Sequence, residues 1–186
     1  NDNSRARLAK LQANTRRLGV QNIDYTLYDA TRLTYKLPNA KFDKVLLDAP
    51  CSGEGMMLLD NPKDFESWSV AHIKRLQKLQ KQLITQAWKL VKPSGVLVYS
   101  TCTMAPEENE AVIDYLLRHQ PDAHILPFET PTLSNRRPSV LSWNDKLYTP
   151  QISDAVRLQS SGAIEAFFVC VLSKRATTED TDYYRL

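Results

Sequence analysis

Residues 42–53 read FDKVLLDAPCSG, and this stretch decides how the chain folds. Its first part, FDKVLL, is a short and mostly apolar run, which predicts a buried strand of a parallel sheet. Pro50 lacks a backbone donor and restricts Ala49, so the chain must leave the sheet directly after Asp48. The sequence therefore presents a carboxylate, Asp48, and a thiol, Cys51, on a constrained turn at the end of a strand.

The periodicity of the rest of the chain predicts strands that alternate with helices. Apolar spacing predicts helices over 4–18, from Ser69 to the KPSG turn at 92–95, and over 105–119. The segments rich in β-forming residues are 23–29, 42–48, 95–100, 123–128 and 165–174. This alternation indicates a three-layer α/β sheet.

Two segments show no such pattern. Residues 129–161 are rich in Pro and Ser, so we predict loops that lie over one edge of the sheet. The polar end ATTEDTDYYRL, residues 176–186, is typical of a disordered tail. Residues 1–175 are then one domain, long enough to bury a core.

Composition narrows the class of protein. The 186 residues are 42% hydrophobic and 24% charged, with a net charge of +3, which is ordinary for a globular protein. No apolar run approaches the roughly eighteen residues of a membrane span. Three cysteines without C-x-x-C spacing, and three histidines without ligand spacing, argue against a disulfide framework and a metal site. A reducing compartment, most simply the cytoplasm, is expected.

Cys102 lies in YSTCTMAPEEN, just past a predicted strand and just before a helix expected to begin near Ala105 or Pro106. The N-terminus of a helix stabilises a thiolate through its dipole and its unpaired N–H groups, although Glu107 and Glu108 would offset this partly. A small buried core residue is the alternative interpretation of Cys102, since free cysteines are commonly buried.

The ends of the predicted strands bring candidate groups together. Ligands of open α/β sheets bind beyond the carboxyl ends of the strands, where Asp29, Asp48 and Cys102 are expected. Two thiols and a carboxylate suit covalent catalysis: one thiolate adds to an electron-poor double bond, and the second thiol acts as a base. Carbon 6 of a pyrimidine is such a site, and carbon 5 can then take a methyl group from a sulfonium. A helix cap or a salt bridge for Asp48, and a buried turn residue for Cys51, remain the structural alternatives.

Longer stretches resemble a known family. DAPCSGEG, followed by a long helix and by GVLVYSTCTMAPEENEAVIDYLL, resembles the RNA 5-methylcytosine methyltransferases of the NOL1/NOP2/Sun family. The opening NDNSRARLAKLQANTRRLGV, YDATRL and EAFFVCVLSK are similar to other parts of that family. The resemblance implies a Rossmann-like class I methyltransferase sheet with helices on both faces, S-adenosylmethionine as cofactor, and RNA as substrate, ribosomal RNA before transfer RNA.

The resemblance also implies roles for single residues. Cys102 would attack carbon 6 of the cytosine, and Cys51 would assist release of the methylated RNA by removing the carbon 5 proton. Asp48 would contact the base edge and lie close to the methionyl amine of the cofactor. The implied ribose-binding acid, nearby cofactor-site arginine and adenine-side acid are Asp2, Arg7 and Asp29. Taken alone, Asp2 is better explained as a helix cap, but the order of Asp2, Asp29 and Asp48 at successive strand ends favours the cofactor role.

The chain departs from the family at its start. A glycine-rich loop of the type PGGKT, the first strand and an upstream RNA-binding segment are expected in the family, and the five glycines here form no such loop. The sequence therefore predicts a truncated catalytic domain that binds the cofactor poorly and shows no activity alone. Two rivals are an amino-group methyltransferase, which would need a proline-proline-aromatic turn, and a non-catalytic RNA-binding module.

Other residues receive structural interpretations. Cys170, within FFVCVL, is predicted to be a core residue. The three tryptophans are expected to pack, with Trp68 also a candidate for stacking on RNA bases. Asn109 is expected to buttress the loop that carries Cys102. Basic residues on the helices predicted at 4–18 and from Ser69 read as solvated faces or as phosphate contacts.

Overall fold

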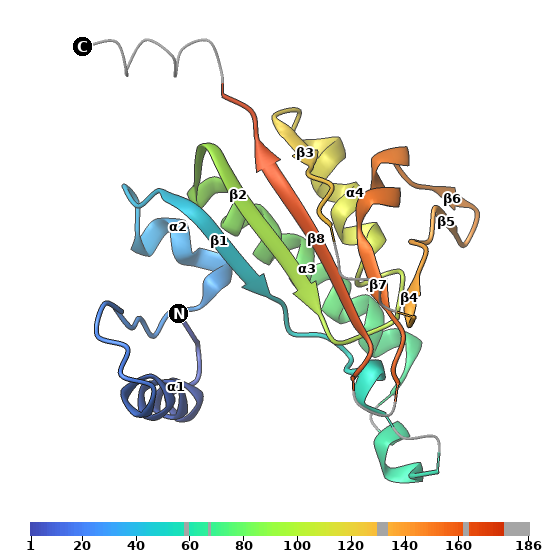
Figure 1. Ribbon diagram of the computed structural model, residues 1–186, viewed down its shortest axis with the longest axis horizontal. Helices are drawn as coiled ribbons and strands as arrows, with labels where there is room; N and C mark the ends of the chain where they lie inside the picture. Colours follow the sequence, from blue (N-terminus) through green and yellow to red (C-terminus); the bar gives the residue numbers. More distant parts are fainter. Residues whose placement is uncertain (58–59, 67, 130–133, 162–163, 177–186) are drawn as a thin grey trace. The chain divides into compact units, whose positions relative to one another are not determined.

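The computed structural model describes residues 1–57, 60–66, 68–129, 134–161 and 164–176. The chain divides into two compact units, residues 1–40 and residues 41–186 (Figure 1). The predicted tail from residue 177 onward lies outside the described residues.

The first unit contains one long helix. Helix α1 (Arg5–Arg17) confirms the helix predicted at 4–18, and the Ser4 hydroxyl caps it by accepting a hydrogen bond from the N–H of Arg7. Gly19 follows with φ +71°, a left-handed conformation that glycine adopts without steric cost. Two short helices, η1 (Ala30–Arg32) and α2 (Leu33–Lys36), complete the unit.

The strand predicted at 23–29 does not form. The N–H of Asp2 donates to the carbonyl of Thr26 (3.1 Å), and the Asn1 side chain bridges to the backbone of Tyr28. No described residue of the first unit is in a strand that could continue this pairing as a ladder. The prediction was wrong because β-forming residues make a strand only where a neighbouring strand accepts their hydrogen bonds.

The second unit is built on a six-stranded sheet with the order β1-β2-β8-β7-β4, in which β3 also pairs with β8. Strands β1 and β2 are parallel, and the other pairs are antiparallel. The strands are β1 (Phe42–Asp48), β2 (Val91–Thr101), β3 (Ala123–Ile125), β4 (Arg136–Arg137), β7 (Val156–Leu158) and β8 (Phe167–Lys174). Strands β5 (Ser142–Trp143) and β6 (Lys146–Leu147) form a separate hairpin.

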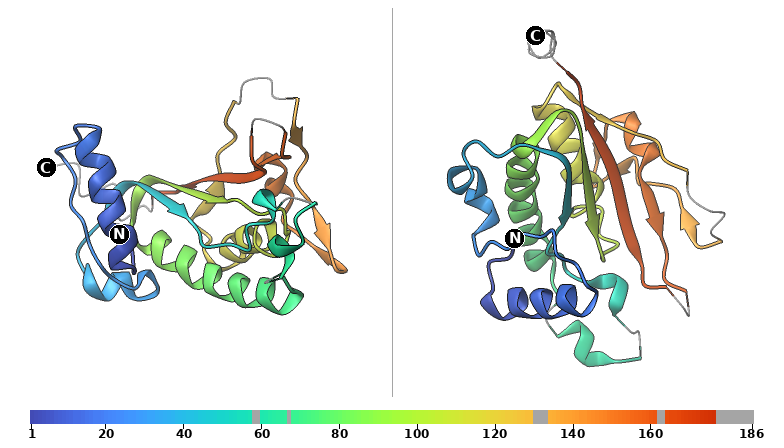
Figure 2. Two further views of the ribbon diagram at one scale, coloured as in Figure 1. Left: turned by 90° about the horizontal axis from the view of Figure 1, so that it is seen from below. Right: turned by 60° about the vertical axis from the view of Figure 1, so that its left-hand side comes forward.

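Two helices of the second unit, α3 (Val70–Leu90) and α4 (Glu110–His119), pack against each other on one face of this sheet (Figure 2). Ser69 caps α3 as predicted, with its hydroxyl accepting from the N–H of His72 at 3.1 Å. The core between the helices and the sheet is centred on the fully buried rings of Trp88, Tyr99 and Phe168. Among the described residues, no helix combines the length and the apolar character needed to cross a membrane.

Strand β1 has the predicted bounds but not the predicted burial. Val45 and Leu47 pack against the core, whereas Leu46 is 70% exposed. The strand lies at the edge of the sheet with β2 as its neighbour, and alternate side chains of a strand point to opposite faces. Val45 and Leu47 point to the face that α3 and α4 cover, whereas Leu46 points to the opposite face and is exposed.

Residues 129–161 are more regular than the sequence predicts. Within this region, β7 pairs with β8 and β4 pairs with β7, so the described part extends the sheet instead of forming loops alone. These strands have two or three residues each, which is too short for a periodic signal. Their pairing becomes possible only when the edge of β8 is in place.

A buried ion pair fastens this region to the rest of the unit. The guanidinium of Arg157 on β7 binds the carboxylate of Glu110 on α4 at 2.5 Å, and the two side chains are 5% and 0% exposed. Arg157 Nη1 also donates to the carbonyl of Met104, and Glu110 Oε1 accepts from the N–H of Val140. The pair therefore fixes the segment that follows β2.

We predict that Arg157→Met lowers the free energy of unfolding by about 3–5 kcal/mol, because it leaves the Glu110 carboxylate buried without its cation. Lys92→Met is the matched control, since the Lys92–Asp43 pair is exposed and should contribute far less. Urea unfolding followed by circular dichroism measures both. Equal losses in the two variants would contradict this assignment.

Candidate active site

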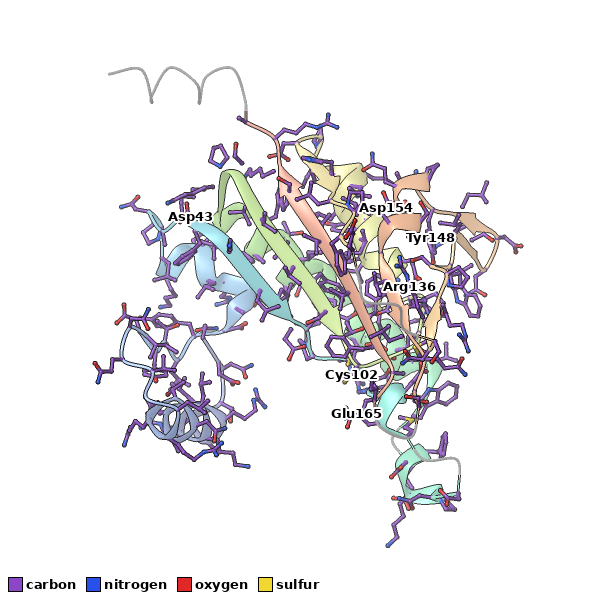
Figure 3. All side chains as sticks on the ribbon, viewed as in Figure 1. Asp43, Cys102, Arg136, Tyr148, Asp154 and Glu165 are labelled. Carbon is purple, nitrogen blue, oxygen red and sulfur yellow. The ribbon has the colours of Figure 1, made fainter. Side chains whose placement is uncertain are left out.

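The parallel pairing of β1 with β2 brings the two predicted cysteine loops together. Asp48 is in register with Ser100, whose hydroxyl donates to Asp48 Oδ1 at 3.1 Å. Beyond these strand ends, the Sγ atoms of Cys51 and Cys102 lie 3.1 Å apart, and both side chains are partly buried. Figure 3 shows Cys102 at the end of the sheet opposite to Asp43, which lies at the start of β1. The expectation that Asp48 and both thiols lie at the same end of the sheet, beyond the carboxyl ends of the strands, is confirmed.

The backbone holds the two loops in close contact. The N–H of Gly55 donates to the carbonyl of Cys102 at 2.9 Å, and the N–H of Ala166 donates to the carbonyl of Gly55 at 3.4 Å. A Cβ atom at position 55 would lie 2.5 Å from the Ala166 oxygen and 2.8 Å from the Cys102 oxygen. Glycine is therefore required here by close approach of three backbone segments.

Side-chain hydrogen bonds tie the same loops. The hydroxyls of Ser52 and Thr103 lie 2.8 Å apart, and Asn109 Nδ2 donates to the Thr103 carbonyl at 2.9 Å. The Thr101 hydroxyl donates to Asn109 Oδ1 at 2.5 Å, with both residues fully buried. The predicted role of Asn109 as a buttress of the Cys102 loop is confirmed.

The helix expected to begin near Ala105 begins at Glu110. Residues 106–109 form a turn, in which the N–H of Glu108 donates to the carbonyl of Ala105 at 3.1 Å. The stretch from Cys102 to the first residue of α4 thus contains more residues than two helical turns. Because the dipole effect falls off within the first turn, the N-terminus of α4 is too far away to act on Cys102.

The surroundings of Cys51 disfavour its thiolate form. Burial raises the pKa of Cys51 to about 12, with the hydrogen bond to Cys102 and the charge of Cys102 as further causes. Cys51 therefore keeps its proton at neutral pH, and either sulfur atom can be the donor in the contact between them. A thiol that donates to Cys102 Sγ stabilises negative charge on that atom, as a nucleophile needs.

The predicted cofactor residues Asp2, Arg7 and Asp29 lie in the first unit. Arg7 Nε and Nη2 bind the Asp2 carboxylate at 2.9 Å, and this interaction is the first cause that lowers the pKa of Asp2. The helix cap is Ser4, so the capping alternative for Asp2 is wrong. Asp29 does not follow a strand: it caps η1, and its bonds from Thr31 lower its pKa.

Sequence reasoning missed two buried residues beneath the loops. Gln80 Nε2 donates to the Pro50 carbonyl at 2.8 Å and to Glu108 Oε2 at 2.7 Å. Glu108 Oε2 also accepts from the N–H of Ser52 at 3.0 Å. The signal for Gln80 was available, because it is a polar residue within the apolar stripe of α3 that includes Ile73 and Leu83. Glu108 carried no comparable signal among its acidic neighbours.

The remaining predictions have mixed outcomes. Cys170 and Trp88 are core residues as expected. Trp68 and Trp143 are 42% and 41% exposed, so packing alone does not describe them, and their indoles donate to Glu54 Oε1 and Glu107 Oε1. Within the described ranges, no cluster of His, Cys, Asp and Glu is arranged to hold a metal ion.

Comparison with known proteins gives consistent matches. The family described as 16S rRNA methyltransferase RsmB/F matches residues 1–171. The tRNA (cytosine(49)-C(5))-methyltransferase of Pyrococcus abyssi is 39% identical over 175 residues, which are 94% of this chain and 54% of that protein. Ribosomal RNA small subunit methyltransferase F of Aeromonas salmonicida is 37% identical over 181 residues, or 97% of this chain and 36% of that protein.

Solved structures agree with the fold. A methyltransferase homolog from Pyrococcus horikoshii has a TM-score of 0.75 at 31% identity, covering 92% of this chain and 51% of that one. NSun6 from the same organism has a TM-score of 0.68 at 31% identity, covering 94% and 40%. The predicted Rossmann-like α/β class is confirmed. The chain spans about half of the first curated relative and about a third of the second. Since the family match extends over 171 residues, the chain belongs to the RsmB/F (Sun) family of RNA methyltransferases.

Proposed function

We propose that this chain carries the catalytic cysteines of an RNA cytosine-5 methyltransferase that uses S-adenosylmethionine and forms a covalent cytosine adduct. The observation that carries the proposal is the 3.1 Å separation of the Cys51 and Cys102 sulfur atoms on two loops fixed at the ends of parallel strands. A reaction that adds one sulfur atom to a ring and then removes a proton from the adjacent carbon needs two groups this close.

In the proposed reaction, the Cys102 thiolate forms a bond to carbon 6 of the cytosine. The electron pair of the double bond between carbons 5 and 6 moves into the ring and makes carbon 5 nucleophilic. When bound, S-adenosylmethionine would supply carbon 5 with an electrophilic methyl group and would be left as the neutral thioether. Removal of the proton from carbon 5 then restores the double bond and expels Cys102 as a thiolate.

Cys51 is the proposed proton acceptor of the last step. In the free protein its raised pKa keeps it protonated, and two of the causes are the hydrogen bond and the charge of Cys102. Both disappear once Cys102 has become a thioether. The pKa of Cys51 is then lower than in the free protein, while burial, which is its largest cause, still raises it.

The carboxylates of Asp2 and Asp29 in the first unit are compatible with binding of the cofactor. Asp2 and Asp29 have lowered pKa values and stay ionised at neutral pH. The backbone hydrogen bond from Asp2 to Thr26 brings the segments that carry these two acids side by side. A carboxylate can accept hydrogen bonds from ribose hydroxyls, so Asp2 and Asp29 are the proposed ribose-side and adenine-side acids. Arg7 orients Asp2, and Asp48 is proposed to contact both the methionyl amine and the cytosine.

The RNA substrate follows from the relatives and from charge. One relative is named for transfer RNA and another for ribosomal RNA, and we propose ribosomal RNA first and transfer RNA second. Lys74, Arg75 and Lys78 are exposed on α3 and are the proposed phosphate contacts of the second unit. A cytoplasmic location fits this substrate. The paired thiols favour this function over a non-catalytic RNA-binding module or an amino-group methyltransferase.

We predict that Cys51→Ala, made in the intact protein that contains this chain, accumulates an RNA–protein adduct that survives denaturation. The adduct should be lost in Cys51→Ala/Cys102→Ala, because the attacking sulfur is gone. Gel electrophoresis under denaturing conditions, with RNA and S-adenosylmethionine present, measures it. Cys170→Ala is the matched control, since this buried thiol should be dispensable for turnover. Absence of an adduct in Cys51→Ala would argue against the covalent mechanism.

A second prediction needs no RNA. Cys51 should react slowly with iodoacetamide at pH 8, and Cys102→Ala should accelerate it, because two causes of the raised Cys51 pKa are removed. Each unit by which that pKa falls raises the thiolate fraction about tenfold. Mass spectrometry of the labelled peptides gives the rates. An unchanged Cys51 rate would show that the two sulfur atoms are not coupled.

A further inference from the structure

Two buried oxygen atoms beneath the Cys51 loop have no hydrogen-bond partner among the described residues. They are Gln80 Oε1 and Glu108 Oε1, on two side chains that are 0% exposed. A buried acceptor without a donor is costly, and native proteins rarely leave one. The two oxygens belong to side chains that already bind each other through Gln80 Nε2 and Glu108 Oε2 at 2.7 Å.

The surroundings of Glu108 disfavour a negative charge. Its two hydrogen-bond donors, the N–H of Ser52 and Nε2 of Gln80, are neutral and both bind Oε2. Burial raises the pKa of the carboxyl, and the charged neighbour that contributes is another acid, Glu54. A buried carboxylate without a cation is among the least favourable groups in a protein.

The titratable groups on each neighbouring element do not reverse this. On the Cys51 loop they are Cys51 itself, with its pKa raised, and Glu54. On β2, the Tyr99 hydroxyl donates to the Glu108 backbone carbonyl at 2.7 Å and not to its carboxyl. On β7, the guanidinium of Arg157 is bound to Glu110.

We propose that Glu108 is a neutral carboxylic acid whose Oε1–H donates to Gln80 Oε1, and that this acid–amide pair is the device that positions Cys51. A carboxylic acid and a primary amide are complementary, because each offers one donor and one acceptor on the same side. One proton on Glu108 therefore satisfies both unpartnered oxygens at once.

The Glu108–Gln80 pair forms hydrogen bonds with the loop backbone on both sides of Cys51. The second N–H of Gln80 Nε2 donates to the carbonyl of Pro50 at 2.8 Å, and Glu108 Oε2 receives the N–H of Ser52 at 3.0 Å. The backbone before and after Cys51 is thus anchored to α3 and to the turn before α4. Glu108 and Gln80 are positioning residues, and this role deepens the proposed function, on which its catalytic meaning rests.

The protonation state is tested on this chain alone by comparing wild type with Glu108→Gln, in which an amide replaces the neutral acid. A folded-state pKa above the ordinary value of 4.5 means that wild type loses stability as the pH rises from there, while the amide variant does not. The urea midpoint of Glu108→Gln minus that of wild type should therefore increase from pH 4.5 to pH 8. Glu107→Gln is the matched control, because its partner Trp143 can still donate to an amide oxygen. If this difference increases no more than it does for Glu107→Gln, or decreases, the proposal that Glu108 is a neutral acid is overturned.

The positioning role is tested by the alkylation rate of Cys51. Glu108→Ala should raise this rate about tenfold or more by releasing the loop, while Glu108→Gln keeps the wild-type rate. Gln80→Met is the second variant, in case Glu108→Ala does not fold, and it should raise the rate in the same direction. A wild-type rate in the folded Ala or Met variant would overturn the role.

In the intact protein, Glu108→Ala should lower kcat more than it raises KM and should accumulate the RNA adduct, because Cys51 is misplaced for the release step. Glu108→Gln should restore both. If no adduct forms even in Cys51→Ala, the proposed function fails while the pH and alkylation results still decide the acid–amide pair. If Cys51→Ala traps RNA and Glu108→Ala releases it at the wild-type rate, the positioning role fails and the function stands.

Discussion

The parallel pairing of β1 with β2 is the constraint on which the site depends. Its register sets Asp48 beside Ser100, so both strands end at the same level and their loops leave the sheet together. Two loops that are fifty-one residues apart in sequence can then place their sulfur atoms in contact. A shift of one residue would turn every side chain of β1 to the other face and carry Cys51 away from Cys102.

Pairing of strands brings the loops near each other, and polar packing makes them rigid. The close approach at Gly55 joins the Cys51 loop to the backbone of Cys102 and Ala166. Asn109 fixes the loop after β2 through Thr101 and Thr103. These bonds are buried, where an unsatisfied group is costly, so each loop has few alternative conformations that satisfy its polar groups. Such stiffness suits a reaction in which two sulfur atoms act in turn on adjacent carbons.

Several local predictions failed for one shared reason, which is that the deciding partner lies far away in sequence. The segment 23–29 has the composition of a strand but no ladder partner among the described residues of its unit. Leu46 belongs to an apolar run but lies at a sheet edge. The helix expected from Ala105 begins later, because the Glu108 carbonyl accepts from Tyr99 of β2 and the Asn109 side chain binds the loop that follows β2. The short strand β7 forms against β8, and no local periodicity announces it.

Local sequence patterns were enough to predict the α/β alternation, the start of the long helix at Ser69, and the placement of Asp48, Cys51 and Cys102 after strands. Those features follow from local rules of periodicity, capping and proline geometry, which act within a few residues. The raised pKa of Cys51 and the side chains that hold the loops depend on the folded structure. Burial of Cys51, the contact of Gln80 with Glu108 and the ion pair of Glu110 with Arg157 all join residues from separate elements. Electrostatic environment depends on those distant neighbours, and a linear pattern contains no measure of them.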